Sequence, residues 1–232
     1  MKKIIILTCI IIMALSLHSQ EVRTLSLIKN GDVKELVISG IDWITFSNFS
    51  VPNTPEGVLI NGVVWATCNV DMPGNFASQP NEAGMFYQWN RNIGWSSADP
   101  MVNSNGGTVW NSSVPTGNSW ETANNPCPTG WRLPTMAEQQ SLVNSDSFWG
   151  KLDGVSGRFF GTGEQKVFFP AAGYRSGYYG DLSYVNYYGY YWSGEPHSEY
   201  NDQAFSIYFQ NNYTYADYRT RTYGCSVRCV LE

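Results

Sequence analysis

Histidine is nearly absent from this sequence of 232 residues, which contains only His18 and His197. Nucleophilic triads normally need a histidine base that is held by a carboxylate. Only His197 lies beyond the leader segment considered next, and its polar context, SGEPHSEY, predicts a surface position. A pair of carboxylates can hydrolyse a glycosidic bond without histidine, but no two acids fall on a recognisable scaffold. We therefore expect no catalytic residue, no enzyme activity and no cofactor.

Long apolar segments are also lacking, apart from one near the start of the chain. Residues 4–17 follow Lys2 and Lys3 and precede the small residue Ser19, which is the pattern of a cleaved signal peptide over residues 1–19. No later segment approaches the roughly 18 apolar residues that cross a bilayer. The protein is therefore predicted to be secreted or held at the cell surface, with no direct membrane span.

Basic residues are few. Without Lys2 and Lys3 the chain has 12 Lys and Arg against 19 Asp and Glu, a net charge of −7. Nucleic acids and anionic lipids bind to basic faces, so neither is expected as a partner.

Four cysteines follow the leader, at Cys68, Cys127, Cys225 and Cys229. In an oxidising compartment an even number predicts two disulfides, and three pairings are possible. A metal site is not expected, because no histidine or second close cysteine pair lies near Cys225 and Cys229 in the sequence.

Turn signals divide the rest of the chain. Residues 20–50 alternate between apolar and polar residues around Asn30-Gly31, which predicts an N-terminal β-strand appendage. Residues 51–56 are predicted to be a linker, and residues 57–232 the main domain. Two elements of that domain are short helices: one over PNEAGMFYQWNRN, and one after the capping-box pair Thr135 and Glu138.

The remaining segments of the main domain predict short strands and loops. An Asn61-Gly62 turn predicts a hairpin at its start. Residues 92–126 show no periodicity, and a loop of that length is either functional or fixed by packing. Two helices beside small antiparallel sheets and long irregular loops indicate an α+β domain.

Six motifs, in the order NGVVWATCNV, PNEAGMFYQWN, CPTGWRLPTMAE, FFPAAGYR, YYWSGEP and GCSVRCV, resemble the Fibrobacter succinogenes major paralogous domain family. The resemblance covers residues 57–232 and implies a fold related to C-type lectins and formylglycine-generating enzymes. The segment before it looks like an element often found ahead of domains in secreted proteins of Bacteroidetes-type bacteria. In such a fold the first and last strands pair, which implies the disulfides Cys127 with Cys229 and Cys68 with Cys225.

The calcium site of C-type lectins is not expected here. Gln79-Pro80-Asn81 resembles part of that site but precedes the first predicted helix, so we interpret it as a turn. Glu195-Pro196-His197 lacks the neighbouring acidic residues that calcium needs. We predict no metal.

Tyrosine is concentrated in one segment. Fourteen of the fifteen tyrosines lie in residues 174–223, where Tyr, Ser, Gly and Asn fill 27 of the 50 positions. Antigen-combining loops share this composition, because tyrosine offers a large amphipathic contact area with few torsions to restrain. We expect Tyr174, Tyr191 and Tyr223 to pack inside, and Trp131 to belong to the core.

Two sets of residues alternate in this region. Apolar and glycine positions are predicted to form a scaffold: Ala171, Ala172, Gly173, Leu182, Val185, Gly189, Trp192, Ala204, Phe205, Ile207, Phe209, Val227 and Cys229. Polar and tyrosine positions are predicted to bind a ligand: Ser176, Tyr178, Tyr179, Tyr184, Asn186, Tyr187, Tyr188, Tyr190, His197, Tyr200, Asn201, Asp202, Asn211, Asn212, Tyr213, Tyr215, Asp217 and Tyr218.

The second set consists only of Tyr, Asn, Asp, His and Ser. Some proteins of the lectin-like fold are targets of diversity-generating retroelements, which rewrite adenines in asparagine-type codons and yield these residues. The resemblance therefore implies a receptor or adhesin with a variable combining surface, whose partner is a protein or glycan on another cell, a phage or a host. A fixed glycan-binding adhesin, or a structural fimbrial or surface-assembly component that uses its N-terminal strands for edge pairing, is the alternative.

Overall fold

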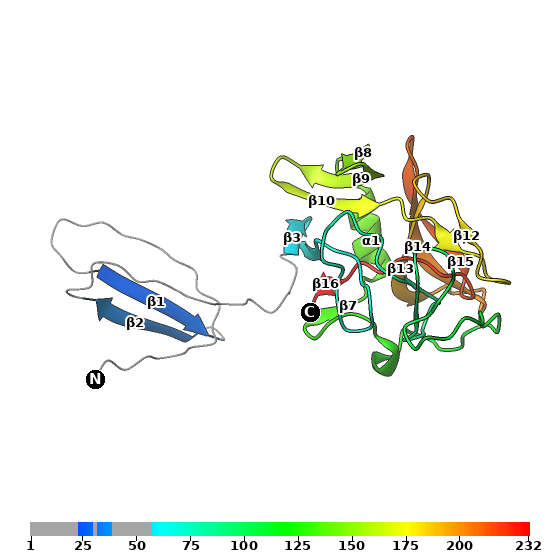
Figure 1. Ribbon diagram of the computed structural model, residues 1–232. Helices are drawn as coiled ribbons and strands as arrows, with labels where there is room; N and C mark the ends of the chain where they lie inside the picture. Colours follow the sequence, from blue (N-terminus) through cyan, green and yellow to red (C-terminus); the bar gives the residue numbers. More distant parts are fainter. Residues whose placement is uncertain (1–22, 30–31, 39–56) are drawn as a thin grey trace. The chain divides into compact units, whose positions relative to one another are not determined.

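The computed structural model describes residues 23–29, 32–38 and 57–232 (Figure 1). The predicted signal peptide, the Asn30-Gly31 turn and the predicted linker lie outside these residues. The described residues fall into two units, one with strands β1 and β2 and one that begins after Ser50. No helix in the described part of the chain is long and apolar enough to cross a membrane.

The first unit contains two antiparallel strands, β1 (Arg23–Lys29) and β2 (Asp32–Ile38). Their register places Lys29 opposite Asp32 and Arg23 opposite Ile38. The strands on either side of Asn30-Gly31 therefore pair as the sequence predicts.

The second unit is mostly β structure, with one α-helix among residues 57–232. In chain order its elements are β3 (Gly57–Ile60), β4 (Val63–Ala66), β5 (Phe86–Tyr87), β6 (Gly94–Trp95), the 3₁₀ turn η1 (Thr122–Asn124), β7 (Trp131–Arg132), α1 (Met136–Val143), β8 (Ser147–Leu152), β9 (Val155–Thr162), β10 (Gln165–Pro170), β11 (Tyr174–Arg175), β12 (Leu182–Ser183), β13 (Gly189–Pro196), β14 (Gln203–Phe209), β15 (Thr214–Thr220) and β16 (Val230–Leu231). The domain is therefore of the mixed α+β class.

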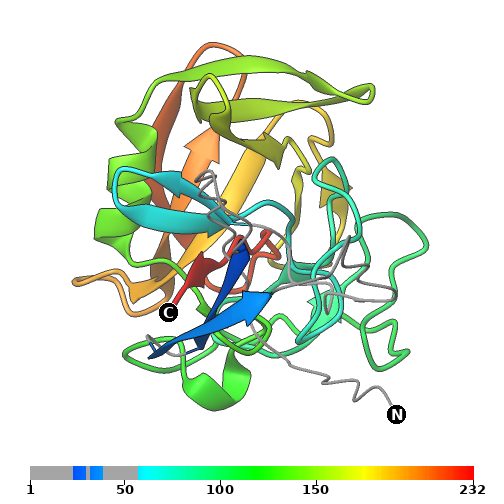
Figure 2. The same ribbon diagram turned by 90° about the vertical axis from the view of Figure 1, so that its left-hand side faces the viewer.

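The start and the end of this unit meet in one sheet of order β3-β4-β16-β7 (Figure 2). Val230 of the last strand lies between Trp65 of β4 and Arg132 of β7. The β3-β4 hairpin has the predicted turn, with Asn61 and Gly62 at φ values of 49° and 83°. Two positive φ angles favour Asn-Gly, so local sequence sets this hairpin.

Two three-stranded antiparallel sheets, β10-β9-β8 and β13-β14-β15, make up most of the rest of the domain. Helix α1 packs against β14 and β15 (Figure 2). Thr135 Oγ1 accepts a hydrogen bond from the Glu138 N–H, and the Glu138 carboxylate accepts one from the Thr135 N–H. This capping box confirms the predicted start of the helix.

The other predicted helix, over residues 80–92, is wrong. Phe86 and Trp89 are fully buried, as a shared apolar face would require, but Phe86 and Tyr87 form strand β5. Tyr87 exchanges two backbone hydrogen bonds with Cys225, at 2.8 and 3.0 Å. This distant pairing uses the backbone groups that a helix would need.

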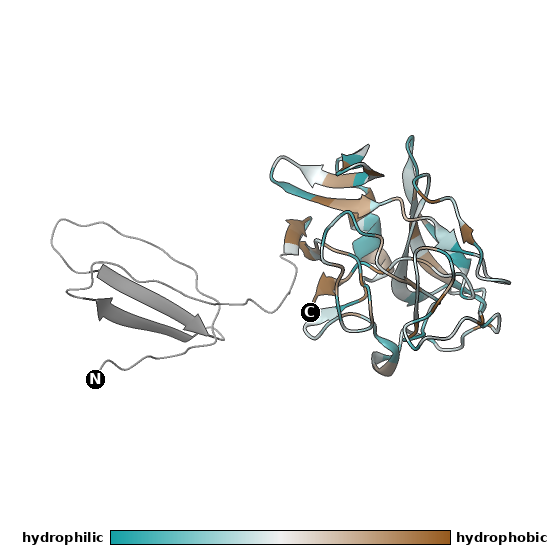
Figure 3. Ribbon diagram, viewed as in Figure 1, coloured by the Kyte–Doolittle hydropathy of each residue, from teal (hydrophilic) through white to brown (hydrophobic). Residues whose placement is uncertain are grey.

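The core of the domain is rich in aromatic side chains. Hydrophobic segments coincide with β3, β10 and β16 (Figure 3). Trp131 is buried, as predicted, and packs edge to face against Phe76 with 5.5 Å between ring centres. Leu142 of α1 is fully buried against the cluster that includes Phe160 and Phe209.

The long loop over residues 92–126 is fixed by buried side chains. Arg221 lies over the Trp89 ring at 4.2 Å and donates to the carbonyl groups of Pro115, Gly117 and Gln203. Trp110 is buried and donates to the carbonyl of Gly177. These contacts support the packing interpretation of this loop.

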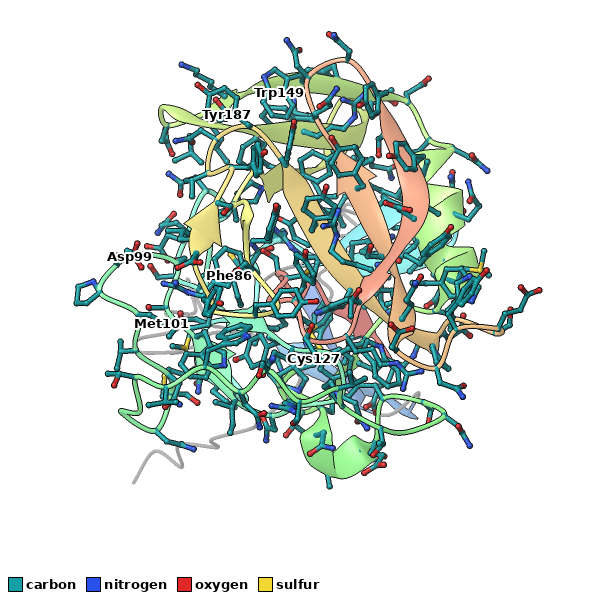
Figure 4. All side chains as sticks on the ribbon, turned by 90° about the vertical axis from the view of Figure 1, so that its right-hand side faces the viewer. Phe86, Asp99, Met101, Cys127, Trp149 and Tyr187 are labelled. Carbon is teal, nitrogen blue, oxygen red and sulfur yellow. A yellow bond between two sulfur atoms is a disulfide. The ribbon has the colours of Figure 1, made fainter. Side chains whose placement is uncertain are left out.

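Arg175 fixes the part of the loop around Ala98 and Asp99. Figure 4 labels Asp99 and Met101 in this part of the loop. This arginine is fully buried and donates to the carbonyls of Ser96, Ala98 and Gly180. Its ion pair with the exposed Asp99 carboxylate, at 3.3 Å, is a weak addition.

One of the two predicted disulfides is present. Cys127 and Cys229 are joined, which ties the segment before β7 to the final strand (Figure 4). Cys68 and Cys225 are both buried free thiols, so the predicted second disulfide is wrong. Buried thiols of this kind pack as small hydrophobic groups.

Candidate binding surface

Most of the predicted ligand-binding residues are exposed. Four are half-buried: Ser176, Tyr188, His197 and Asp217. Tyr190, with 6% exposure, is buried. The remaining thirteen are exposed: Tyr178, Tyr179, Tyr184, Asn186, Tyr187, Tyr200, Asn201, Asp202, Asn211, Asn212, Tyr213, Tyr215 and Tyr218.

Eight tyrosines make one connected group of rings, here called the tyrosine cluster: Tyr174, Tyr184, Tyr188, Tyr190, Tyr208, Tyr213, Tyr215 and Tyr223. Neighbouring ring centres lie 4.5 to 6.4 Å apart, within the range of favourable aromatic pairs. The cluster begins where the core ends, with buried Tyr190 and Tyr208, and its outer members reach solvent.

Strand register brings the inner part of the cluster together. Tyr190 on β13 lies opposite Tyr208 on β14, and Tyr208 lies opposite Tyr215 on β15. Because side chains alternate along a strand, Tyr213, Asp217 and Arg219 project from the same face as Tyr215. Ile207 and Phe209 project from the other face into the core.

The outer part of the cluster comes from the turn before β13. Tyr184 stacks on Tyr188 with 4.5 Å between ring centres, and Tyr188 contacts Tyr208. Tyr184 and Asn186 both have positive φ, at 58° and 67°. For a tyrosine this conformation is uncommon and costs backbone strain, so packing must hold it.

Two glycines hold this turn in place. Gly173 has φ of 76° and donates to the carbonyl of Tyr188, and a Cβ atom there would lie 2.1 Å from the Ser183 carbonyl oxygen. Gly189 lies opposite Phe209, and a Cβ atom would collide with that ring. Both positions therefore belong to the scaffold, as predicted.

The scaffold prediction fails at one position. Val185 is 39% exposed, because it lies on the tip of the 184–188 turn with Asn186 and Tyr187. Leu182 and Phe205 are half-buried, and the other aliphatic and aromatic scaffold residues are buried. Tyr191 is fully buried, as predicted, while Tyr174 and Tyr223 are half-buried members of the cluster.

Tyr190 needs a correction of its own, because its ring is covered. It packs under the guanidinium group of Arg219, whose central carbon lies 3.6 Å from the ring centre. Burial raises the pKa of Tyr190, and the positive charge of Arg219 opposes this rise. Tyr190 therefore supports the surface rather than facing a ligand.

Arg219 was not among the predicted residues. Its guanidinium lies 5.3 Å from the Tyr174 ring centre and 5.2 Å from that of Tyr223, in addition to the contact with Tyr190. The sequence does hold a signal for it. Tyr213, Tyr215 and Asp217 are two residues apart and share one face of β15, and Arg219 is the next residue on that face.

A second aromatic group lies on the opposite face of the same sheet. His197 contacts Tyr200, Phe205 and Tyr218, with 4.7 to 5.4 Å between ring centres. Tyr218 lies opposite Phe205 on the neighbouring strand. Because side chains alternate along β15, Tyr218 projects from the face opposite to that of Tyr215 and Asp217. The predicted residues therefore form two surfaces.

The turn over residues 176–181 carries two more exposed tyrosines. Tyr178 and Tyr179 are 79% and 78% exposed, and the turn is fixed by Arg175 and Trp110 beneath it. Tyr187, also highly exposed, lies at the periphery of the molecule (Figure 4). These three side chains have large free areas for contact with a partner.

The predicted ligand-binding residues that are exposed form an open surface. Two open hollows, of about 340 and 380 Å³, lie elsewhere: one beside Asn61 and Thr162, the other beside Trp120 and Glu195. Within the described residues, no group of three or more His, Cys, Asp or Glu side chains is arranged to hold a metal ion. Contacts here would come from aromatic rings, amides and one guanidinium.

The fold and this surface define an α+β domain with a tyrosine-rich face. Residues 143–230 match a family described as "Domain of unknown function (DUF8237)". The matched segment contains the whole tyrosine cluster. No curated protein and no solved structure matches the chain.

Proposed function

We propose that this protein is an exported receptor or adhesin, and that the tyrosine cluster with its exposed neighbours is its combining surface. The observation that carries the proposal is the arrangement of exposed Tyr and Asn side chains on a rigid aromatic base. Tyr187 and Tyr213 are 69% and 44% exposed, although aromatic residues usually pack inside. Such side chains gain much contact area at little entropic cost when a partner covers them.

The proposed scaffold is C-type lectin-like. The pairing of β16 with β4, next to the β3-β4 hairpin, brings the ends of the domain together as that fold requires. The irregular segment over residues 92–126 and the Cys127–Cys229 disulfide also agree with it. In this proposal the loops display the combining residues and the sheets hold them in place.

Variation of the surface by a retroelement is a further part of the proposal. The buried partners of the surface, such as Trp192, Ala204 and Ile207, are separate from the exposed Tyr and Asn positions. Substitution at exposed positions is therefore expected to leave the fold intact. The gene neighbourhood tests this: it should contain a near-identical repeat that differs at adenines, and a reverse transcriptase. If both are missing, the variation hypothesis fails and a fixed surface remains.

The binding proposal is tested with Tyr187→Ala and Tyr213→Ala on arrays of glycans and of immobilised cell-surface proteins. Both variants should lose the binding that the unchanged protein shows. Phe148→Ala is the matched control, because Phe148 is an exposed aromatic residue on β8, in a different sheet. Equal losses in all three variants, or unfolding of the tyrosine variants, would contradict the proposal.

A further inference from the structure

Within residues 57–232, Arg219 is the only positive charge that lies over the rings of the tyrosine cluster. Three rings surround its guanidinium, and Tyr190 stacks on it at 3.6 Å. Such stacking holds the planar group in one orientation and leaves its edge available for hydrogen bonds.

The donors of Arg219 are not used inside the domain. Its Nε atom is buried and has no hydrogen-bond partner, so a ligand can reach only the two terminal nitrogens, which form no hydrogen bond within residues 57–232. The two ion pairs found in residues 57–232 are Arg132 with Glu138 and Arg175 with Asp99, and neither includes Arg219. By contrast, the buried Arg158, Arg221 and Arg228 all donate to backbone carbonyls. A held guanidinium with unused donors is suited to a carboxylate, which accepts two parallel hydrogen bonds.

An acidic side chain, Asp217, projects from the same face two residues before Arg219 on β15. It does not form an ion pair with Arg219. The negative charge of Asp217 repels any second acidic group that a ligand carries close to the carboxylate bound by Arg219. The surface therefore favours a ligand with a single carboxylate over a densely charged polyanion.

The rings beside Arg219 suit a sugar. Tyr174 contacts both the Arg219 guanidinium and the exposed Tyr184, whose ring stacks on Tyr188. The faces of sugar rings stack on tyrosine, and amide groups such as that of exposed Asn186 can hydrogen-bond to sugar hydroxyls. Carboxylate recognition and ring stacking are thus available side by side.

We propose that Arg219 binds the carboxylate of an acidic saccharide whose ring stacks on the adjoining tyrosines, as uronic and sialic acids would. This inference rests on the proposed function and narrows the ligand to one chemical class. A protein ligand with an acidic side chain is the competing source of the same carboxylate, and the experiment separates the two.

The experiment follows the arginine Nε–H signals of the unchanged protein by ¹⁵N NMR during titration with sodium glucuronate. Parallel titrations use glucose, sodium acetate and a short Asp-containing peptide in place of glucuronate. The Arg219 signal, identified by its loss in Arg219→Lys, should shift and saturate with glucuronate. Binding of acetate and of the peptide should be weaker by about tenfold or more, and glucose should leave the signal unchanged.

Variants give a second measurement. Arg219→Gln should weaken glucuronate binding by about tenfold or more, whereas Lys166→Gln should not change it. Lys166 is an exposed cation on β10, so the control removes the same charge from another sheet. Asp217→Asn should strengthen binding.

An Arg219 signal that responds equally to glucuronate and acetate, or more strongly to the peptide, overturns the saccharide assignment. No response to any acidic probe overturns the carboxylate site itself. If Tyr187→Ala and Tyr213→Ala abolish binding of a partner but Arg219→Gln does not, the proposed function stands and this inference fails. If the tyrosine variants bind that partner normally, the proposed function fails.

Discussion

The guanidinium of Arg219 on β15 lies over the ring of Tyr190 on β13, with its central carbon 3.6 Å from the ring centre, so the pair spans the β13-β14-β15 sheet. Tyr190 is buried, whereas Arg219 is only half-buried. The pair therefore connects the aromatic core to the exposed tyrosines. Its geometry leads to the first prediction.

Tyr190→Ala is expected to lower the free energy of unfolding by about 3 to 5 kcal/mol, because a large buried ring is lost. Tyr190→Phe keeps the ring and should cost far less. Urea unfolding of both variants measures the difference. If Tyr190→Ala unfolds with the same free energy as the unchanged protein, the Tyr190 side chain is exposed and not buried.

Exposed tyrosines should behave in the opposite way. Tyr187→Ala is expected to change the free energy of unfolding by less than about 0.5 kcal/mol, because its side chain is 69% exposed. Trp131→Ala should cost about 3 to 5 kcal/mol, because its ring packs in the core. Thermal unfolding compares the two, and a large loss in Tyr187→Ala would count against the combining surface.

Arg221 is predicted to hold the long loop. Arg221→Lys keeps the charge but cannot reach the carbonyls of Pro115, Gly117 and Gln203 together, so a loss of about 2 to 3 kcal/mol is expected. Hydrogen exchange should become faster in residues 112–120. Arg132→Lys is the control, since Arg132 is half-buried and donates to the Glu138 carboxylate of α1, outside this loop. Unchanged exchange in Arg221→Lys would mean that other contacts fix the loop.

The cysteines should respond differently to chemical treatment. Cys127→Ser is expected to cost about 2 to 5 kcal/mol, because the disulfide closes a long loop. Among residues 57–232, alkylation with iodoacetamide should modify no thiol in the folded protein and two thiols, Cys68 and Cys225, in denaturant. Burial raises the pKa of Cys225 to about 12, which further slows its reaction. Isolation of a Cys68–Cys225 disulfide peptide would refute this assignment.

Alkaline pH is expected to destabilise the domain. Burial raises the pKa of Tyr191 to about 12 from its ordinary value of 10.0. The unfolded chain therefore releases this proton first, and stability falls as the pH rises from about 10 to 12. Burial also raises the pKa of the Cys225 thiol, from 9.0 to about 12, so this group lowers the stability further as the pH rises above about 9. Urea midpoints at several pH values measure the fall, which should be smaller in Tyr191→Phe.

Local signals in the sequence predict the structure well where local interactions decide it. The Asn61-Gly62 turn needs two positive φ angles, and the Thr135 capping box needs two reciprocal hydrogen bonds. Each depends on residues within four positions of one another.

Distant contacts explain the failures. The expected helix at Phe86 becomes a strand because Tyr87 pairs with Cys225, which is far away in the sequence. The same pairing fixes the backbone of Cys225, whose thiol stays free. The sequence predicts Tyr190 to be one more surface tyrosine, but Arg219 on the distant strand β15 lies over its ring. None of these contacts has a local signature.

The disulfide has a mechanical consequence under the proposed role as an adhesin. Cys127 and Cys229 enclose every residue of the tyrosine cluster in one covalent loop. Tension applied between the two ends of the domain passes through the sulfur–sulfur bond and bypasses residues 128–228. Force along the chain therefore does not stretch the tyrosine-bearing segment. The bound partner dissociates, or the strands outside the loop separate, first.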